Sequence, residues 1–397
     1  MPLALLALAL GAFAIGTTEF IPVSLLPDIA GSYSVTIPTA GWLITGYALG
    51  VTLGAPIMAG LGPRMSRKRM LLICLALLIA GNLVSALAPG FEFALIGRII
   101  ASLAHGAFFG IGAVVAGNLV SPERRAGAIA TMFTGLTVAT LAGVPLGTLL
   151  GQHFGWRLSF GVVAAIGGAA FLGVAALVPD QPAPENARLR HEISVLKNPQ
   201  VLLAMAMTVL GFGGVFAAIT YLAPMMTTVT GFADSSVTWI MVVFGLGFLL
   251  GNLVGGRFAD RHLMPLLYVA LSGLTLALAL FPLTAHNKIS AVITVLIIGA
   301  LGFATVPPLQ KRVLDQAASA PTLASALNIG AFNLGNALSA WLGGLVIAAG
   351  YGYTAPSWVG VALSGTAVVL AVLSGALERR AGQRIPAYSH ETPLATR

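Results

Sequence analysis

Long apolar runs alternate with short polar connections along almost the whole of this sequence. Each run is close to the roughly 20 residues that an α-helix needs to cross the hydrocarbon core of a bilayer. The pattern therefore predicts an all-α integral membrane protein with twelve transmembrane helices, and an even number of spans puts both termini on one side. We place the helices at residues 3–26, 38–60, 70–88, 91–118, 127–150, 158–178, 200–226, 236–256, 265–284, 289–308, 322–348 and 356–376.

The composition supports a membrane protein and argues against a soluble one. Hydrophobic residues make up 57% of the 397 residues and charged residues 8%, whereas a soluble domain carries about 25% charged residues. So few charged side chains could not cover the surface of a soluble core of this size. The single cysteine, Cys74, excludes a disulfide framework or a thiolate metal site built within the chain.

The positions of the basic residues predict the orientation of the helices. The net charge is +8, and most of the 20 Lys and Arg residues fall after the even-numbered spans or in the C-terminal tail. By the positive-inside rule, both termini and the 179–199 loop lie in the cytoplasm. A nucleic-acid partner would need these charges on one folded face, so we expect none. No basic region precedes the first span, which argues against a signal peptide.

A polar, proline-rich segment at residues 179–199 divides the chain into two halves that resemble each other. At an offset of 197 residues, Trp42 aligns with Trp239 and Pro27 aligns with Pro224. A repeat of six spans in the same orientation predicts two parallel bundles that hold a substrate between them near the membrane midplane. The predicted units are a six-helix bundle over 1–178, a cytoplasmic linker over 179–199, a second six-helix bundle over 200–378 and a cytoplasmic tail over 379–397.

Several motifs carry a resemblance to a known family. The first two spans contain GTTEFIPVSLLPDIA and AGWLITGYALGVTLGAP, the fourth contains GRIIASLAHGAFFG, the fifth contains GVPLGTLLG, and GRFADR ends the eighth. These motifs resemble the twelve-span drug:proton antiporter branch of the major facilitator superfamily, which includes bacterial sugar-efflux and chloramphenicol-resistance-type exporters. The resemblance covers residues 3 to about 378. It implies two bundles related by pseudo-twofold symmetry and the export of small molecules in exchange for protons.

The same resemblance implies residues that control opening on the cytoplasmic side. In the first half, the loop GLGPRMSRKR has Arg64 where the family usually has an aspartate. We therefore expect Asp260 to make the corresponding contact in the second half. The other gating candidates lie in that loop, in the fifth-span motif and in GRFADR, and they are Arg67, Gly143, Pro145, Gly147, Gly256 and Arg261.

Three ionisable residues lie inside the predicted spans, namely Glu19, Arg98 and His105. Such residues are costly in hydrocarbon and usually mark an ion or substrate path. At a rise of about 1.5 Å per residue, Glu19 and Arg98 lie at similar depth, and the resemblance makes their helices neighbours. We predict that these three residues carry the coupling proton, with Glu19 binding it and pairing with Arg98 when it is charged.

Structural roles for the same residues are the alternative. Glu19 and Arg98 could only neutralise each other, Arg98 could only hold helices together, and His105 could only form a hydrogen bond between packed helices. Pro22 follows Glu19 by three residues, and it predicts a local kink that frees backbone carbonyls beside the carboxylate.

Polar and aromatic side chains in several spans are candidates for substrate contacts. Asn333 and Asn336 are one helical turn apart and could line one cavity, although asparagines also join membrane helices through hydrogen bonds. Aromatic residues at helical spacing more often pack against other helices. The full set of substrate candidates is Tyr47, Phe212, Phe216, Tyr221, Asn328, Asn333 and Asn336.

The sequence therefore predicts proton-coupled efflux of drugs or sugar-like metabolites across a bacterial inner membrane by alternating access. The alternative is a facilitator or exporter of one metabolite, such as a sugar, nucleoside or amino-acid derivative, without proton coupling. The loops contain no catalytic set, no Walker motif and no metal-ligand cluster, so we expect no enzyme, cofactor or metal. The expected partners are a small-molecule substrate, protons and the bilayer, and we expect a monomer. The polar segment from Glu378 onward is expected to be disordered.

Overall fold

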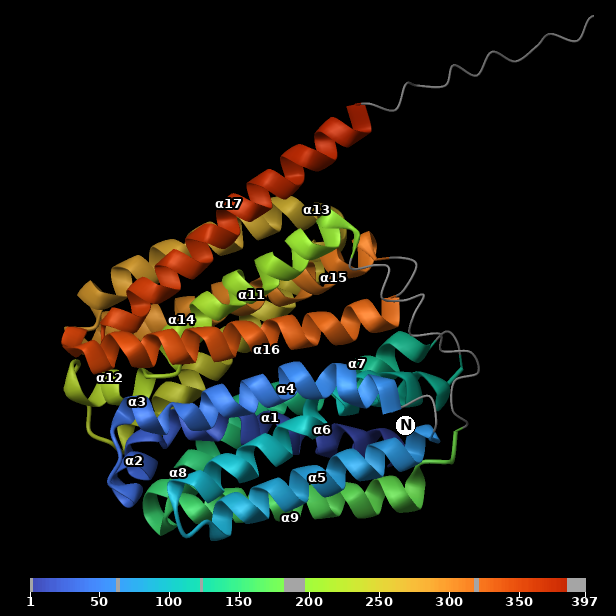
Figure 1. Cartoon of the computed structure of the whole chain (residues 1–397), viewed down its shortest axis with the longest axis horizontal. Helices are drawn as coiled ribbons and strands as arrows, with labels where there is room; N and C mark the ends of the chain where they lie inside the picture. The colour runs from blue at the N-terminus through green and yellow to red at the C-terminus, as the bar shows by residue number, and fades with distance from the viewer. Residues whose placement is uncertain (1–2, 62–64, 122–123, 182–196, 318–320, 384–397) are drawn as a thin grey trace, which may run out of the picture.

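The computed structural model describes residues 3–61, 65–121, 124–181, 197–317 and 321–383 of the chain, and within these ranges it contains helices and no strand. Figure 1 shows the helices packed side by side in two groups, with α1 to α9 in one and α11 to α17 in the other. The first half consists of α1 (Leu3–Ser24), α2 (Leu26–Tyr33), α3 (Ile37–Ala40), α4 (Trp42–Leu61), α5 (Arg67–Leu87), α6 (Phe91–Asn118), α7 (Arg125–Val138), η3 (Ala139–Gly143), α8 (Val144–Phe154) and α9 (Trp156–Leu177). The second half consists of α11 (Pro199–Ile219), α12 (Leu222–Thr228), α13 (Ser236–Thr284), α14 (Lys288–Ala304), α15 (Val306–Gln316), α16 (Pro321–Val346), η5 (Ile347–Tyr351) and α17 (Ala355–Gln383).

The described residues form twelve membrane spans, as the hydrophobic pattern predicts. Eleven helical segments are long and apolar enough to cross a bilayer, and one of them is the 49-residue α13. At about 1.5 Å per residue, α13 would be roughly 73 Å long if it were straight, more than twice the thickness of the hydrocarbon core. Its backbone leaves the helical conformation at His262 (φ −138°, ψ 45°). It therefore supplies the eighth and ninth spans, with the turn between them at His262.

Helix α1 begins and helix α17 ends at the same end of the molecule, which is called the terminal end below. In Figure 1, the beginning of α1 and the end of α17 lie on the right, whereas α2, α3 and α12 lie at the opposite end on the left. The two halves contact each other mainly where α4 packs against α16 and where η3 and α8 pack against the first part of α13. The predicted 179–199 linker lies mostly outside the described residues.

The fifth span packs closely against α1 through small residues. Gly143, Gly147 and Gly151 recur every four residues and face α1, so they form one stripe along it. A Cβ atom added at Gly147 would lie 2.6 Å from the Cδ1 atom of Ile21, so the side chain of Ile21 would have to move to admit a larger residue. These glycines thus allow the two helices to pack closely.

A π-helical turn interrupts the fifth span at Ala139–Gly143, just before Pro145. In a regular α-helix, the ring of Pro145 would collide with the carbonyl group of Leu141, four residues earlier, and Pro145 has no N–H group to donate. One wider turn relieves this collision while the helix continues across the membrane. The motif therefore places an irregular backbone segment at the boundary between the halves, because η3 also packs against α13.

The last helix continues beyond the point where the sequence predicted a disordered tail. Helix α17 runs to Gln383, and Glu378 accepts a hydrogen bond from Nη1 of Arg312 at 2.9 Å. The expectation of disorder is thus wrong for residues 378–383, because a partner on α15 holds the first acidic side chain of the segment. Residues 384–397, the rest of the predicted tail, lie outside the described residues.

Candidate functional site

Arg98 is fully buried on α6 and is held by backbone and hydroxyl oxygens of the first half. Its Nη1 atom donates to the carbonyl oxygen of Thr18 at 2.7 Å and to Oγ1 of Thr18 at 2.9 Å. Its Nε atom donates to the carbonyl oxygen of Leu43 at 3.4 Å. The guanidinium group also lies over the ring of Tyr47, 4.1 Å from the ring centre, in a cation–π contact.

The carbonyl group of Thr18 is available to Arg98 because of a proline. In an α-helix this carbonyl would accept from the N–H group four residues later, which is the position of Pro22. Since proline has no N–H group, the Thr18 carbonyl is free to accept from Arg98. The prediction that Pro22 frees a carbonyl beside Glu19 is confirmed.

A polar cluster extends from Arg98 to a third helix. The Oγ1 atom of Thr18 donates to Oδ1 of Asn82 on α5 at 2.7 Å, and Nδ2 of Asn82 donates to the carbonyl oxygen of Leu78 at 2.8 Å. Thr18 and Asn82 were not among the predicted site residues, since nothing in the spacing of these common polar residues connects them. The cluster holds Arg98 in place by joining α1, α4, α5 and α6 within the first half.

Glu19 and His105 face each other beside this cluster. The Oε2 atom of Glu19 lies 3.9 Å from Nδ1 of His105, and the two side chains are 11% and 8% exposed. The same Nδ1 atom lies 3.2 Å from the hydroxyl oxygen of Tyr47. A carboxyl group and an imidazole at this separation form a pair that can exchange a proton through a small movement or a bridging water.

Glu19 and Arg98 do not form the expected direct ion pair in this structure. Among the described residues, Glu19 has its ion-pair contact with His105, and Arg98 has neutral oxygens as its hydrogen-bond partners. The physical reason is the rotation of about 100° between successive residues of a helix. Thr18 contacts Arg98, and Glu19, which lies one position further round the helix, contacts His105.

An aromatic cluster fills the interior of the second half near the boundary. Phe212 and Phe216 are buried on α11, as expected for packing residues. The ring centre of Phe212 lies 5.2 Å from that of Phe303 and 5.0 Å from that of Phe332. The ring of Phe216 lies 5.7 Å from that of Phe20, which follows Glu19 on α1. The cluster therefore crosses from the second half to the first next to the Glu19–His105 pair.

The three candidate asparagines lie on α16 but face different surroundings. The Nδ2 atom of Asn328 donates a hydrogen bond to Oε1 of Gln310 on α15 at 2.7 Å, so this side chain joins two helices of the second half. Asn333 donates to the carbonyl oxygen of Ile329 at 3.1 Å, on its own helix. The Oδ1 atoms of Asn328, Asn333 and Asn336 are buried and have no hydrogen-bond partner among the described residues.

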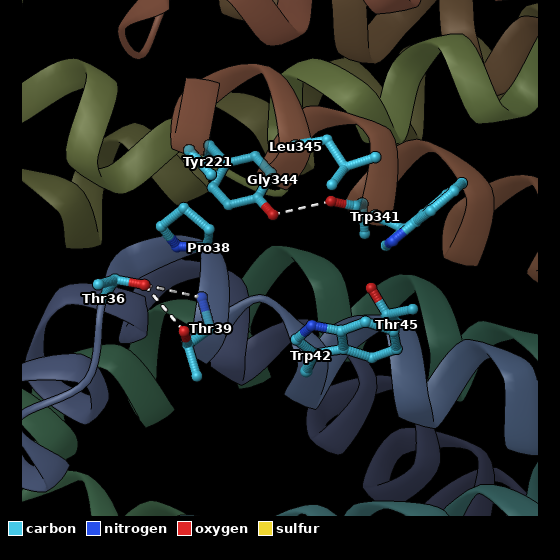
Figure 2. A pocket seen from close by; sticks show the side chains of 11 residues that line it. Thr36, Pro38, Thr39, Trp42, Thr45, Tyr221, Trp341, Gly344 and Leu345 are labelled. Carbon is cyan, nitrogen blue, oxygen red and sulfur yellow. Dashed lines mark hydrogen bonds between the residues drawn. The ribbon is translucent and has the colours of Figure 1, made fainter. Parts of the chain in front are cut away.

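Tyr221 lies in a groove of about 230 Å³ between the halves, near the end opposite the termini. Figure 2 shows Trp42 on one side of this groove and Trp341 on the other, one from each half. The Tyr221 hydroxyl donates to the carbonyl oxygen of Ala340 at 2.7 Å. The structure thus places Tyr221 in this groove, apart from Tyr47, which contacts Arg98 and His105.

A second cavity of about 170 Å³ lies between the halves and has a carboxylate from each half in its wall. Asp28 comes from α2, and Asp234 precedes α13. Partial burial raises the pKa of Asp28, its own backbone N–H group lowers it, and the Asp234 carboxylate raises it. Gln152 on α8 bridges the boundary beside them, because its Nε2 atom donates to the backbone oxygen of Asp234 at 2.7 Å and its Oε1 atom accepts from Thr238 at 3.1 Å. These residues were not among the predicted site residues, because they are far apart along the chain and no motif connects them.

The predicted gating residues are distributed over both halves. Arg64 lies outside the described residues, and Arg67 begins α5 next to the N-cap residue Ser66. Asp260 lies 3.8 Å from Lys311 in a solvent-exposed ion pair within the second half. The remaining candidates of GRFADR are Gly256 and Arg261. Both are exposed and lie just before the turn at His262 in the middle of α13. The structure does not bring these residues together into one site.

Comparisons with known proteins agree with this architecture. The model of the Major Facilitator Superfamily matches residues 8–338. The "Inner membrane transport protein YdhP" of Escherichia coli is 45% identical over 370 residues, which cover 93% of this chain and 95% of that protein. A "Chloramphenicol resistance protein" of Streptomyces lividans is 36% identical over 377 residues, covering 94% and 95%. A "Probable sugar efflux transporter" of Helicobacter pylori is 31% identical over 340 residues, covering 85% and 87%.

Proposed function

Since the chain belongs to the major facilitator superfamily and is a multi-pass membrane transporter of small molecules, we propose that it is a proton-coupled exporter. The names of two relatives, a chloramphenicol resistance protein and a probable sugar efflux transporter, support export as the direction of transport. In this proposal the protein lies in a bacterial inner membrane as a monomer, with both termini in the cytoplasm. The basic residues of the described chain support that orientation, because most of them lie near the terminal end.

The observation that carries the proposal is the Glu19–His105 pair, which is separate from the fixed charge of Arg98. Three hydrogen bonds and the ring of Tyr47 hold Arg98 within the first half, so it can stay charged throughout a transport cycle. Glu19 has the imidazole of His105 at 3.9 Å and a small exposed fraction. Of the buried ionisable groups in this half, Glu19 and His105 are thus the ones placed to gain and lose a proton.

Coupling then follows from competition between a proton and the substrate. When Glu19 is charged, it attracts His105 and can accept a hydrogen bond from a substrate that enters from the cytoplasm. When a proton from the outside binds Glu19, this attraction and this acceptor are lost, and the substrate binds less tightly. Because linkage is reciprocal, substrate binding must release the proton to the same extent. This exchange is antiport.

Proton release on addition of substrate to the purified protein in detergent tests the proposal. Chloramphenicol and a series of neutral sugars serve as probes, with a pH-sensitive dye as the readout. We expect release in the wild type and a loss of at least about tenfold in Glu19→Gln, which keeps the shape of the side chain but cannot ionise. Glu92→Gln, on the exposed first turn of α6, is the matched control and should release protons normally.

The outcomes separate three readings. Equal release in the wild type and Glu19→Gln would refute the role of Glu19, and His105→Asn would then be examined for the same loss. Binding without proton release in any of these proteins would refute proton coupling and favour a facilitator. A transport assay in liposomes with and without a pH gradient gives an independent check, since an antiporter must respond to the gradient.

A further inference from the structure

Two hydrogen-bond acceptors on α16 point to the chemistry of the ligand. Asn333 and Asn336 are 4% and 2% exposed, and the Oδ1 atom of each lacks a partner among the described residues. The orientation of the Asn333 amide is fixed, because its Nδ2 atom donates to the carbonyl oxygen of Ile329. Exchanging its amide nitrogen and oxygen would place two oxygen atoms against each other. The unpartnered atom of Asn333 is therefore an acceptor.

The depth of these asparagines follows from the register of α16 against α4. The two helices are antiparallel, and Thr52 donates to the carbonyl oxygen of Gly330 at 3.2 Å. Gly344 lies against Pro38 on α3, which leads into α4 within the same membrane span, with 3.7 Å between a Cβ atom built at Gly344 and that of Pro38. Both pairs give the same register, because the two residue numbers of each pair add up to the same total, as they must for facing positions of two antiparallel helices.

This register puts the two asparagines at the depth of the proposed proton site. It sets Asn333 opposite residue 49 and Asn336 opposite residue 46 of α4. Tyr47 lies between these two positions, and its hydroxyl group contacts Nδ1 of His105 at 3.2 Å. The unpartnered acceptors, His105 and Glu19 are therefore at one level of the bundle.

The asparagines also face the space between the halves. They follow Ile329 by four and seven residues, so the three side chains share one face of α16. Ile329 lies against Gly106, with 3.8 Å between its Cγ2 atom and a Cβ atom built at Gly106, and Gly106 follows His105 on α6. On the adjacent face of α16, Phe332 packs against Phe212. The asparagines thus lie between the Glu19–His105 pair and the aromatic cluster.

We propose that the substrate of this transporter is an uncharged molecule that donates hydrogen bonds to Oδ1 of Asn333 and Asn336 and places an apolar body against Phe212 and Phe216. The proposal rests on the transport function proposed above and names the class of substrate. Burying an acceptor without a partner is unfavourable, so a ligand that donates to it gains affinity over one that does not. Glu19 adds a third acceptor to the same wall.

The same arrangement disfavours anionic substrates. Arg98 donates through Nε and Nη1 to Leu43 and Thr18 and lies over the ring of Tyr47, which leaves Nη2 as its one donor without a partner among the described residues. A negatively charged ligand beside Asn333 and Asn336 would meet oxygen acceptors and aromatic faces, which replace its hydration poorly. The two asparagine acceptors therefore select for neutral donors.

Matched pairs of ligands test the proposal in the purified full-length protein. Thiamphenicol and florfenicol differ by one hydroxyl group that is replaced by fluorine, and methyl glucoside and its 6-deoxy-6-fluoro derivative form a second pair. Affinity is measured from the concentration dependence of thermal stabilisation in detergent, without a proton gradient. In the wild type, we expect the hydroxyl form of at least one pair to bind about tenfold more tightly.

Variants of α16 then assign the preference to specific residues. Asn333→Leu and Asn336→Leu should each reduce the difference within the pair to about threefold or less. Asn333→Gln keeps an amide donor and an amide acceptor and should retain more of the preference than Asn333→Leu, which separates the loss of the hydrogen bond from a loss of folding. Ser339→Ala is the matched control, because Ser339 is buried on the same helix, its hydroxyl donates to the carbonyl oxygen of Asn336 at 3.2 Å, and its loss should leave the preference unchanged.

Several results would overturn the proposal. These are equal affinity within both pairs, a preference that survives in both Asn333→Leu and Asn336→Leu, tighter binding of an anionic compound such as glucuronate or benzoate, or no saturable stabilisation by any neutral donor. The result is distinguishable from a failure of proton coupling, because the pairs are also compared in Glu19→Gln. Loss of proton release with a retained hydroxyl preference would support both proposals separately.

Discussion

A single methyl group on α13 would test how closely the two halves approach each other. Gly245 lies against the π-helical turn of the fifth span, where an added Cβ atom would be 2.8 Å from the backbone oxygen of Thr140 and 3.1 Å from the Cα atom of Leu141. Both neighbours are backbone atoms, so neither can rotate away as a side chain could. In Gly245→Ala, either the π turn must deform or the halves must separate locally.

The size of the effect follows from these distances and from a matched glycine. Ordinary contacts between non-bonded heavy atoms are about 3.5–4.0 Å, so the shortfall is roughly 0.5 Å or more. Overpacking of this kind costs about 1–3 kcal/mol. Replacing a helical glycine with alanine also stabilises the helix by about 1 kcal/mol. Gly161→Ala on α9 is the control that shows this stabilisation alone, because nothing lies within 4 Å of its added Cβ atom. The difference between the two variants should therefore be about 1–3 kcal/mol, or roughly 5–150-fold in an equilibrium between packed and separated halves.

A reporter cysteine in the groove between the halves measures this equilibrium. Ala340 is fully buried and lines the groove that contains Tyr221. The native cysteine, Cys74, is buried in the first half and should not react with a maleimide in the folded protein. The rate of alkylation of Ala340→Cys should then rise in the Gly245→Ala background relative to Gly161→Ala by the factor given above.

Two results would refute this reasoning. Equal alkylation rates in the two glycine variants would show that Gly245 is not limited by the backbone of the fifth span. A graded series of Gly245→Ser and Gly245→Val should increase the rate further, so a rate that falls as the side chain grows would also contradict the proposed contact. The thermal stability of each variant shows whether a faster rate reflects local separation or unfolding.

Two further predictions concern charged residues at the two ends of the molecule. Partial burial and the Asp234 carboxylate raise the pKa of Asp28 in this packed state. Protonation of Asp28 therefore stabilises the packed state relative to the separated state as the pH falls through that pKa, and this stabilisation is lost as the pH rises. Acid should therefore slow the alkylation of Ala340→Cys. The added substitution Asp28→Asn should make this alkylation slow at neutral pH as well. If the pH dependence of the rate were the same with and without Asp28→Asn, the prediction would be contradicted. At the terminal end, Glu378→Gln weakens a partly exposed contact to the buried Arg312. It should lower stability by about 1 kcal/mol, measured by thermal unfolding, with a smaller effect in high salt.

The fold could be predicted from the sequence largely because the bilayer restricts the possible structures. Each helix must satisfy its own backbone hydrogen bonds and span about 30 Å, so length and hydropathy define the spans. The break between the eighth and ninth spans was also expected, and it occurs at His262. The end of α17 was not, because a polar composition does not reveal that Glu378 finds Arg312 on another helix.

The candidate site was predictable only in its components. The depth of Glu19 and Arg98 and the carbonyl freed by Pro22 follow from the rise of a helix and the chemistry of proline. The partner of Glu19 depends on how α1 is rotated about its axis, which a nearly uniformly apolar helix does not encode in its hydrophobic pattern. The cavity walls formed by Asp28 and Asp234 depend on how the halves meet, and this is determined by contacts between residues that are far apart in the sequence, such as Gln152 and Asp234.

The contacts between the halves are weak enough for ligands to change them. Each salt bridge found among the described residues lies within one half. The hydrogen bonds across the boundary are made by neutral groups, from Thr52 to Gly330, from Gln152 to Asp234 and from Thr238 to Gln152. Such bonds contribute about 1 kcal/mol each. Because a ligand that binds one state about a hundredfold more tightly supplies roughly 3 kcal/mol, one proton or one substrate molecule can shift this balance. Arg98, with its partners all in the first half, can remain in place while the halves move.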